Sequence, residues 1–371
     1  MNYREFGPTG LKVSRLGFGA MRLPMANVEG KDVVDEEKAG AAMRRAFELG
    51  VNYIDSGWFY CNHLSEGAVG RAVKAWGREK IIVSTKYPFQ GTLRETLEKQ
   101  LERLGFDYVD VYHLHGIGTG FLNRADRDAV VGELTRARDE GLIRHLAFSF
   151  HDEPKAMMPL IDMGIFESLL CQYSLLDRAN EEGLAYAKSK GMGTAVMGPL
   201  AGGRLAGMPK EVAARFGVQT KSSAELGLRF VLSNPSIDMA LSGMSSVQQV
   251  EENAAAASDS SELTPGELVG IGEALTEFNR LRELYCTGCD YCAPHCPEKV
   301  AIPRIFGAMN DYRIFGLHDH ARWTYNDIGV SPWSKGAKAD ACTECGLCEE
   351  HCPQKIEIRK QLKECRSILA G

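Results

Sequence analysis

Residues 35–56 read DEEKAGAAMRRAFELGVNYIDS, a helical pattern that leads directly into a strand pattern. The apolar side chains of residues 35–50 recur at helical spacing on one face, and Gly50 suits the position just beyond a helix end. The run from Asn52 to Ser56 has the length and apolar composition of a short strand. This stretch therefore predicts one step of an alternating α/β chain.

The same alternation extends in both directions, from the amino terminus to about Met244. Short apolar or β-branched runs predict eight strands: Leu16 to Met21, Asn52 to Ser56, Ile81 to Tyr87, Tyr108 to His115, Ile143 to Phe150, Ser168 to Ser174, Gly193 to Leu200 and Ile237 to Met244. Amphipathic helical patterns fill the gaps. Eight such units in about 250 residues predict an α/β fold, a (β/α)8 barrel, whose chemistry lies at the carboxyl ends of the strands.

A doubly wound parallel sheet is the alternative fold. It would normally carry a Gly-x-Gly-x-x-Gly turn after its first strand. Gly17, Gly19 and the residues that follow do not supply this turn. The sequence therefore favours the barrel.

Length and composition predict a soluble protein of two domains. The chain has 371 residues, a length that exceeds what one hydrophobic core usually supports. Of these residues, 44% are hydrophobic, as in an ordinary soluble protein. The net charge of −6 argues against a nucleic-acid surface and leaves small molecules or redox proteins as partners. Residues 1–10 lack the pattern of a signal peptide and no apolar run is long enough for a membrane helix, so we expect a cytoplasmic protein.

The domain boundary is predicted near residue 262. Thr264-Pro265-Gly266-Glu267 has the pattern of a helix start, with a capping residue, Pro at the first helical position and a capping-box Glu. This linking helix should run to about Tyr285. We therefore expect a barrel over residues 1–262, and a linking helix with a smaller, mainly helical domain over residues 263–371.

The smaller domain contains two cysteine runs of identical spacing, each ending at a Pro. They are Cys286, Cys289, Cys292 and Cys296 before Pro297, and Cys342, Cys345, Cys348 and Cys352 before Pro353. Cys-x2-Cys-x2-Cys-x3-Cys-Pro is the pattern of bacterial ferredoxins that hold two 4Fe-4S clusters. Zinc is the alternative, but zinc sites use separated pairs of cysteines rather than four in a row.

The fourth cysteine of each such run typically ligates the other cluster. We therefore expect crossed ligation, in which Cys352 completes the site of the first run and Cys296 that of the second. The segment between the runs is longer than the spacer of small ferredoxins. We expect it to be helical, with Trp323 and Trp333 packed between the two halves.

Four stretches of the barrel region carry a family resemblance. They are residues 3–19 (YREFGPTGLKVSRLGFG), 52–60 (NYIDSGWFY), 84–86 (STK) and 110–115 (DVYHLH). Over roughly its first 255 residues the chain resembles the aldo-keto reductase family. The resemblance implies an oxidoreductase that interconverts a carbonyl and an alcohol with NADPH or NADH.

By this resemblance the catalytic tetrad is Asp55, Tyr60, Lys86 and His115. The set also makes chemical sense by itself, because carbonyl reduction needs a proton at oxygen while hydride reaches carbon. Tyr60 would give that proton, with Lys86 lowering its pKa and Asp55 holding Lys86 in place. His115, as a neutral donor, would orient the carbonyl. Taken singly, each of the four residues could have a purely structural role. We interpret His113, two residues before His115, as structural.

The resemblance also implies residues that contact the nicotinamide cofactor. They are Ser149, Gln172, Glu252 and Asn253. Leu200 and Gly202 lie in a Gly-rich loop after a strand, whose backbone amides can approach a pyrophosphate, with a plain turn as the alternative. Several positions depart from the family pattern: Phe150, Met197, Gly243, Met244 and Gln249. The basic residues that bind the 2′-phosphate of NADP in the family are absent, which weakens the prediction of an NADP preference. NAD, or no nicotinamide cofactor, is then the alternative, unless Arg204 supplies the missing charge.

Three functions remain compatible with the sequence. In the first, the barrel is a reductase and the clusters exchange electrons with a partner such as a ferredoxin or flavodoxin. In the second, the clusters of the same reductase are structural or sense oxygen. In the third, the protein is a nucleotide-sensing regulatory subunit, which the complete tetrad disfavours.

Overall fold

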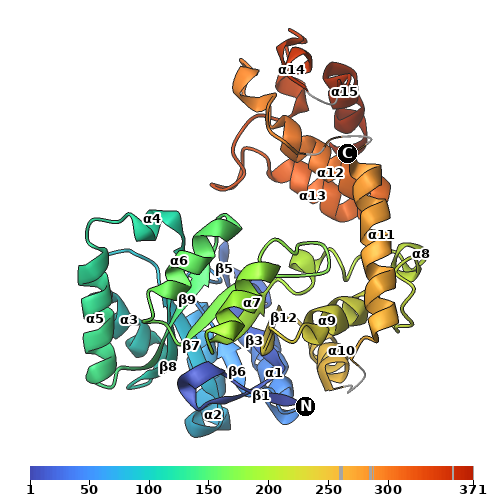
Figure 1. The fold of residues 1–371 in the computed structure, drawn as a ribbon. Helices are drawn as coiled ribbons and strands as arrows, with labels where there is room; N and C mark the ends of the chain where they lie inside the picture. The colour runs from blue at the N-terminus through green and yellow to red at the C-terminus, as the bar shows by residue number, and fades with distance from the viewer. Residues whose placement is uncertain (259–261, 284–285, 287, 353–354, 371) are drawn as a thin grey trace. The chain divides into compact units, whose positions relative to one another are not determined.

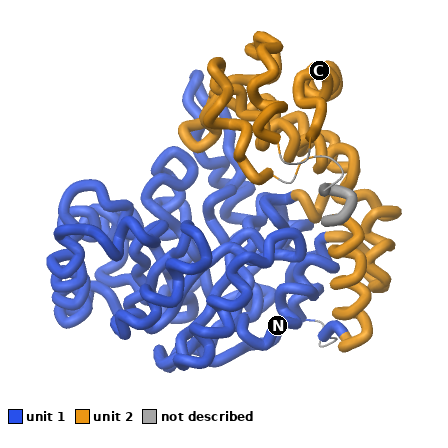
Figure 2. The backbone as a smooth tube through the Cα atoms, turned by 45° about the horizontal axis from the view of Figure 1, so that its top comes forward, with its two compact units in different colours: residues 1–203, 224–263 blue, residues 204–223, 264–371 orange. Residues whose placement is uncertain are grey.

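The computed structural model describes residues 1–258, 262–283, 286, 288–352 and 355–370. The chain forms two compact units (Figure 2). The barrel unit comprises residues 1–203 and 224–263, and the cluster unit comprises residues 204–223 and 264–371. The boundary expected at residue 262 stays a prediction. The segment 204–223 lies between barrel elements in sequence but belongs to the cluster unit.

Eight parallel strands close into a barrel at the centre of the barrel unit (Figure 1). In chain order they are β3 (Leu16–Gly19), β6 (Tyr53–Asp55), β7 (Ile82–Tyr87), β8 (Val109–Ile117), β9 (Ile143–Phe150), β10 (Ser168–Gln172), β11 (Gly193–Met197) and β12 (Met239–Gly243). β12 pairs with β3, which closes the ring. The predicted (β/α)8 barrel is confirmed, and the doubly wound alternative is excluded.

Helices surround this barrel. They are α1 (Glu36–Glu48), α2 (Ser65–Trp76), α3 (Leu93–Leu104), α4 (Thr119–Leu122), α5 (Arg127–Asp139), α6 (Met157–Asp162), α7 (Glu181–Ser189), α9 (Ser223–Ser233) and α10 (Val247–Ser258). α1 shows how the sequence sets these bounds. The Asp35 side chain accepts a hydrogen bond from the Lys38 N–H, and Gly50 takes a left-handed φ of 90° just beyond the helix.

Two antiparallel hairpins extend the barrel unit: β1 (Tyr3–Glu5) with β2 (Lys12–Ser14), and β4 (Met25–Val28) with β5 (Lys31–Val34). The chain after β1 carries Phe6, which is fully buried and meets Tyr53 edge-to-face at 6.1 Å. Tyr53 begins β6, so the first hairpin closes the amino-terminal end of the barrel. The carboxyl ends of the strands remain for chemistry.

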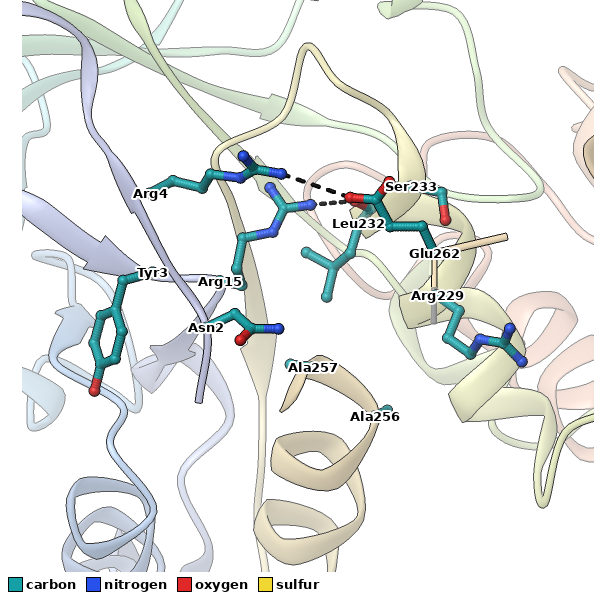
Figure 3. Close-up of a pocket in the computed structure, with 10 residues that line it drawn as sticks. All are labelled: Asn2, Tyr3, Arg4, Arg15, Arg229, Leu232, Ser233, Ala256, Ala257 and Glu262. Atoms are coloured by element: carbon teal, nitrogen blue, oxygen red, sulfur yellow. Dashed lines mark hydrogen bonds and ion pairs between the residues drawn. The ribbon is translucent and has the colours of Figure 1, made fainter. Parts of the chain in front are cut away.

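An arginine-lined pocket of about 300 Å³ adjoins this hairpin (Figure 3). Arg4 points toward Glu262, with 3.6 Å between the charged groups. Arg15 donates to the main-chain oxygens of Leu232 and Ile237. Burial, together with the neighbouring Arg4, lowers the pKa of Arg15 to about 10. Arg15 therefore ties the start of the barrel to α9 and to the chain entering β12.

The cluster unit is helical in the described residues, as predicted. Its helices are α8 (Lys210–Ala214), α11 (Pro265–Glu283), α12 (Ile302–Phe315), α13 (His318–Asp327), α14 (Leu347–Glu350) and α15 (Ile358–Leu369). α11 begins as predicted, since the Glu267 N–H donates to Thr264 Oγ1 at 3.2 Å and the Thr264 N–H to Glu267 Oε2 at 2.8 Å. Its expected end at Tyr285 lies outside the described residues.

The tryptophan prediction for the segment between the cysteine runs is wrong. The segment does form α12 and α13, but Trp323 is 57% exposed and Trp333 is 75% exposed. The core of this region is built instead from smaller apolar side chains of α12, α13 and α15, with Tyr325. Indole rings are therefore not needed to fill the space between the runs.

Candidate functional site

The four tetrad residues come from three neighbouring strands of the barrel. Asp55 ends β6, Tyr60 follows it, Lys86 lies near the end of β7, and His115 lies near the end of β8. These strands pair in the order β6, β7, β8. Because parallel strands present their carboxyl ends at one rim, the four side chains gather there.

Lys86 occupies the centre of the group and is only 1% exposed. Its Nζ donates to Asp55 Oδ2 at 2.5 Å and to the main-chain oxygen of Ser56 at 2.6 Å. Ser84 donates to the other carboxylate oxygen of Asp55 at 2.7 Å. The ammonium is thus fixed by an ion pair that is itself held by a hydroxyl.

The aromatic members of the tetrad lie beside this ion pair. Lys86 Nζ is 4.7 Å from the centre of the Tyr60 ring. The Tyr60 and His115 rings meet edge-to-face, with centres 6.2 Å apart. One ammonium, one phenol and one imidazole therefore converge beside a buried carboxylate.

The pKa of Tyr60 differs from the sequence expectation. Burial raises it above its ordinary value of 10, and this effect outweighs the lowering by Lys86, with Asp55 raising it further. The sequence showed the nearby ammonium but not the depth of the phenol. Tyr60 is therefore held protonated at neutral pH.

The histidines are held neutral. Burial, helped by the charge of Lys86, lowers the pKa of His115 to about 3. Burial likewise lowers the pKa of His113 to about 4. Burial also lowers the pKa of Lys86, but Asp55 and Tyr60 raise it by more, so the ammonium keeps its proton. The site therefore combines one fixed cation with neutral hydrogen-bond donors.

A buried polar network behind β7 supports Lys86, and sequence reasoning missed it. Gln100 Nε2 donates to the main-chain oxygen of Lys86 at 3.1 Å and to Glu66 Oε1 at 2.6 Å. Thr85 donates to the same Glu66 oxygen at 2.6 Å, and Tyr112 donates to Gln100 at 2.7 Å. The available signal was Gln100 itself, which occupies a buried position on the apolar face of α3.

The predicted nicotinamide contacts lie at the ends of β9 and β10. Ser149 is fully buried, and its Oγ accepts a hydrogen bond from the Gly116 N–H at 2.8 Å. Gln172 has an exposed side chain, while its main-chain oxygen accepts from Asn180 at 2.9 Å. Ser149 therefore also fixes the chain next to His115.

The remaining predicted cofactor residues lie in one loop and in helix α10. Leu200 is half-buried, whereas Gly202 lies in a short turn, Ala201–Gly203, with a left-handed φ of 69°. Asn253 is buried and donates to Ser242 Oγ at 3.2 Å. Glu252 is exposed and accepts from Gln248 at 2.8 Å.

The surroundings of two arginines bear on the cations that are missing from the family pattern. Arg204, considered as a substitute for the missing basic residues, lies in the cluster unit and pairs with Asp311 at 3.5 Å. Arg22 instead lies beside the glycine turn, where its Nη1 donates to the Gly202 oxygen at 3.4 Å. Its own main-chain oxygen accepts from Ser245 at 2.7 Å. No spacing in the sequence pointed to Arg22.

The eight cysteines line two small cavities. The first is lined by Cys296, Cys342, Cys345 and Cys348, and the second by Cys286, Cys289, Cys292 and Cys352. Each cavity thus combines three cysteines of one run with the fourth of the other. Among the described residues, no three His, Cys, Asp or Glu side chains are placed to share one metal ion.

The residues just before the two exchanged cysteines contact each other. His295 and His351, each just before the last cysteine of its run, stack with ring centres 3.5 Å apart and an interplanar angle of 9°. Both rings are exposed. The stack joins the two crossing segments of the chain.

Comparison with known proteins gives the family of each region. The sequence profile of the Aldo/keto reductase family matches residues 15–268, more than half of the chain. The chain belongs to the aldo/keto reductase family. It is an oxidoreductase of this NAD(P)-dependent family, and a 4Fe-4S dicluster domain matches residues 285–357. The second match favours iron–sulfur clusters over the zinc alternative.

The alignments of this aldo/keto reductase with individual relatives span most of each relative's length. The chain is 34% identical over 285 residues to an L-galactose dehydrogenase of Arabidopsis thaliana, covering 69% of this chain and 88% of that protein. It is 27% identical over 294 residues to the uncharacterized oxidoreductase YqkF of Bacillus subtilis, with 69% and 91% covered.

Among solved structures, the barrel is similar to the holo form of the aldo-keto reductase AKR11C1 from Bacillus halodurans. The TM-score is 0.64 and the sequence identity 29%, with 74% of this chain and 96% of that chain covered. Within the described residues, no helix combines the length and apolar character needed to cross a membrane.

Proposed function

We propose that this protein reduces a carbonyl compound to an alcohol with NADPH or NADH, and that its two 4Fe-4S clusters exchange single electrons with a redox partner such as ferredoxin or flavodoxin. The observation that carries the first part is the buried Lys86, held by Asp55 and set against the Tyr60 ring next to His115. The relative named L-galactose dehydrogenase supports the same reaction class.

The side chains divide the proton chemistry among them. Tyr60 donates its phenolic proton to the substrate oxygen, which needs it as hydride reaches the carbon. The Lys86 ammonium stabilises the phenolate that remains, and Asp55 keeps the ammonium in place. His115, held neutral by burial, donates a hydrogen bond to the same oxygen and orients the carbonyl.

The chain offers a place for a nucleotide phosphate beside Gly202 and Gly203. Both have left-handed φ angles, and among the described residues no atom beyond the adjacent ones lies within 4 Å of where a side chain at Gly203 would begin. The Arg22 guanidinium stands next to this open backbone. A turn without side chains beside a cation fits an anionic group. When bound, the reduced nicotinamide supplies hydride, and each cluster carries one electron at a time.

A structural role for the clusters is the second candidate. Cys292, Cys348 and Cys352 belong to the buried apolar cluster that also contains Ile305, Phe306 and Leu362. The core of the cluster unit is thus built around the thiols. Loss of the clusters would therefore loosen this core whether or not they carry electrons.

The reductase assignment is tested by Tyr60→Phe. Removing the general acid should lower kcat/KM for carbonyl reduction by about 10²- to 10⁴-fold, as loss of a positioned acid does elsewhere. Tyr3→Phe is the matched control, since it removes an exposed phenol at the other end of the barrel. Undiminished turnover by the Tyr60 variant would exclude this acid.

The electron-transfer assignment is tested by anaerobic titration with NADH and with NADPH while cluster absorbance is followed. Bleaching by either nucleotide would show that the two sites share electrons. If dithionite bleaches the clusters and neither nucleotide does, reduced ferredoxin and flavodoxin are tried in turn. If none of the nucleotides and protein donors reduces the clusters, a structural role for the clusters is favoured.

A further inference from the structure

An exposed aromatic side chain stands directly beside the tetrad. Phe59 precedes Tyr60, and its side chain is 43% exposed. Its ring centre lies 6.4 Å from that of His115, at an angle of 37° between the planes. A large apolar side chain left open next to the groups that hold the substrate oxygen is a candidate contact for the rest of the substrate.

The chain after Tyr60 folds back to support Phe59. Cys61, Asn62 and His63 all take left-handed φ angles, of 50°, 56° and 68°. Consecutive non-glycine residues in this region cost about 1–2 kcal/mol each and persist only when the surroundings impose them. The turn is closed by the Ser65 N–H, which donates to the Tyr60 oxygen at 3.2 Å.

This left-handed turn, residues 61–63, places His63 between two aromatic rings. The His63 ring meets Phe59 at 5.6 Å and 65°, and Trp58 at 6.1 Å and 87°. Both contacts are edge-to-face, the geometry that aromatic pairs prefer. Phe59 is thus backed on one side while part of its surface stays open.

The backing is itself anchored. The Arg103 guanidinium lies 3.9 Å from the centre of the Trp58 ring, and Arg103 pairs with the buried Glu66 at 3.2 Å. The stack from Glu66 through Arg103, Trp58 and His63 therefore limits the movement of Phe59. A contact surface that is fixed before binding loses less conformational entropy when the ligand arrives.

We infer that Phe59 determines substrate specificity, by stacking against the group next to the carbonyl and favouring flat, conjugated or aryl carbonyl compounds over saturated aliphatic ones. The inference rests on the proposed carbonyl reduction and adds the substrate class. Stacking needs a planar partner, whereas a saturated chain gains only ordinary apolar contact from the same ring.

The test compares 4-nitrobenzaldehyde with butanal in the wild type, Phe59→Ala, Phe59→Tyr and the control Tyr3→Ala. Tyr3 is an aromatic residue of similar exposure, 40%, in the hairpin at the amino-terminal end of the barrel. We expect Phe59→Ala to lower kcat/KM for 4-nitrobenzaldehyde about tenfold relative to kcat/KM for butanal, mainly by raising KM for the aryl substrate. Phe59→Tyr should keep the ratio, and Tyr3→Ala should leave both substrates unaffected.

Binding of 4-nitrobenzyl alcohol and of 1-butanol, measured by calorimetry, gives a readout that does not need turnover. An equal loss for both ligands in Phe59→Ala, or no loss for either, would overturn the specificity role. Absence of turnover in the wild type contradicts the proposed reduction, whereas the calorimetric comparison still decides the role of Phe59.

Discussion

A lysine that is almost fully buried must have its charge compensated, because an unpaired ammonium inside a protein loses its proton. Lys86 keeps its proton through Asp55 and Tyr60. The identities of these residues follow from sequence motifs. Their protonation does not, because burial depends on how neighbouring strands and loops enclose the site. The pKa of Tyr60, raised rather than lowered, is the clearest instance.

The pH dependence of carbonyl reduction follows from these directions. The acid Tyr60 must be protonated, and a raised pKa keeps it so beyond pH 10. His115, with a pKa of about 3, stays neutral throughout the same range. We expect kcat/KM to be flat between pH 6 and pH 9 in buffers of constant ionic strength. A decline centred near pH 8 would show that another group is the acid.

His113 should make the fold sensitive to acid. Its folded pKa of about 4 lies below the ordinary 6.5, so the unfolded chain takes up a proton that the folded chain refuses. The stability that depends on neutral His113 is complete above pH 6.5 and falls as the pH drops toward 4, by on the order of 3 kcal/mol.

His113→Leu should therefore flatten the loss of stability between pH 6.5 and pH 4, as measured by urea unfolding at each pH. His113 is 1% exposed, and leucine has a similar size without polar ring nitrogens, so the replacement should cost little at pH 7. An unchanged acid slope in the variant would show that other groups cause it.

At the level of single elements, the eight barrel strands follow from their apolar runs, and the start of α11 follows from its capping pattern. The left-handed turn after Tyr60 does not. Cys61, Asn62 and His63 include no glycine, and although Asn and His tolerate a left-handed φ, no sequence pattern predicts three such angles in a row. In the folded turn, His63 packs against Trp58 and Phe59.

Asn62 is exposed and allows this strain to be measured. Asn62→Val should lower the free energy of unfolding by about 1–2 kcal/mol, because a β-branched side chain is disfavoured at φ 56°. Asn62→Gly, which tolerates that angle, should stay within about 0.5 kcal/mol of the wild type. Equal stability of the two variants, measured by chemical denaturation, would mean that the turn rearranges.

At the scale of the whole molecule, the two cysteine runs were recognisable from their spacing, and the cavities group them across the runs. The sequence did not show that residues 204–223 belong to the cluster unit. Phe216 in this segment packs against Phe278 of α11 at 5.3 Å, and Phe278 against Phe315 of α12 at 5.2 Å. Such a long-range contact has no local pattern.

Crossed ligation predicts the effect of losing one exchanged cysteine. Cys296→Ser should remove a ligand from the cavity of the second run and leave the four thiols of the first run complete. We expect about half of the wild-type iron per chain after anaerobic purification. Cys365→Ser is the control, because Cys365 lines neither cavity. Loss of the first run's cluster alone would contradict the crossing.

The detour of residues 204–223 bears on how this protein could be taken apart. The polypeptide passes between the units three times, after residues 203, 223 and 263. A truncation at residue 263 would leave Phe216, which is fully buried in the intact chain, without its aromatic neighbour Phe278. Modular exchange of the iron–sulfur part between homologous enzymes therefore requires transplanting two separate stretches of gene, and a lone catalytic barrel needs a redesigned loop in place of the first.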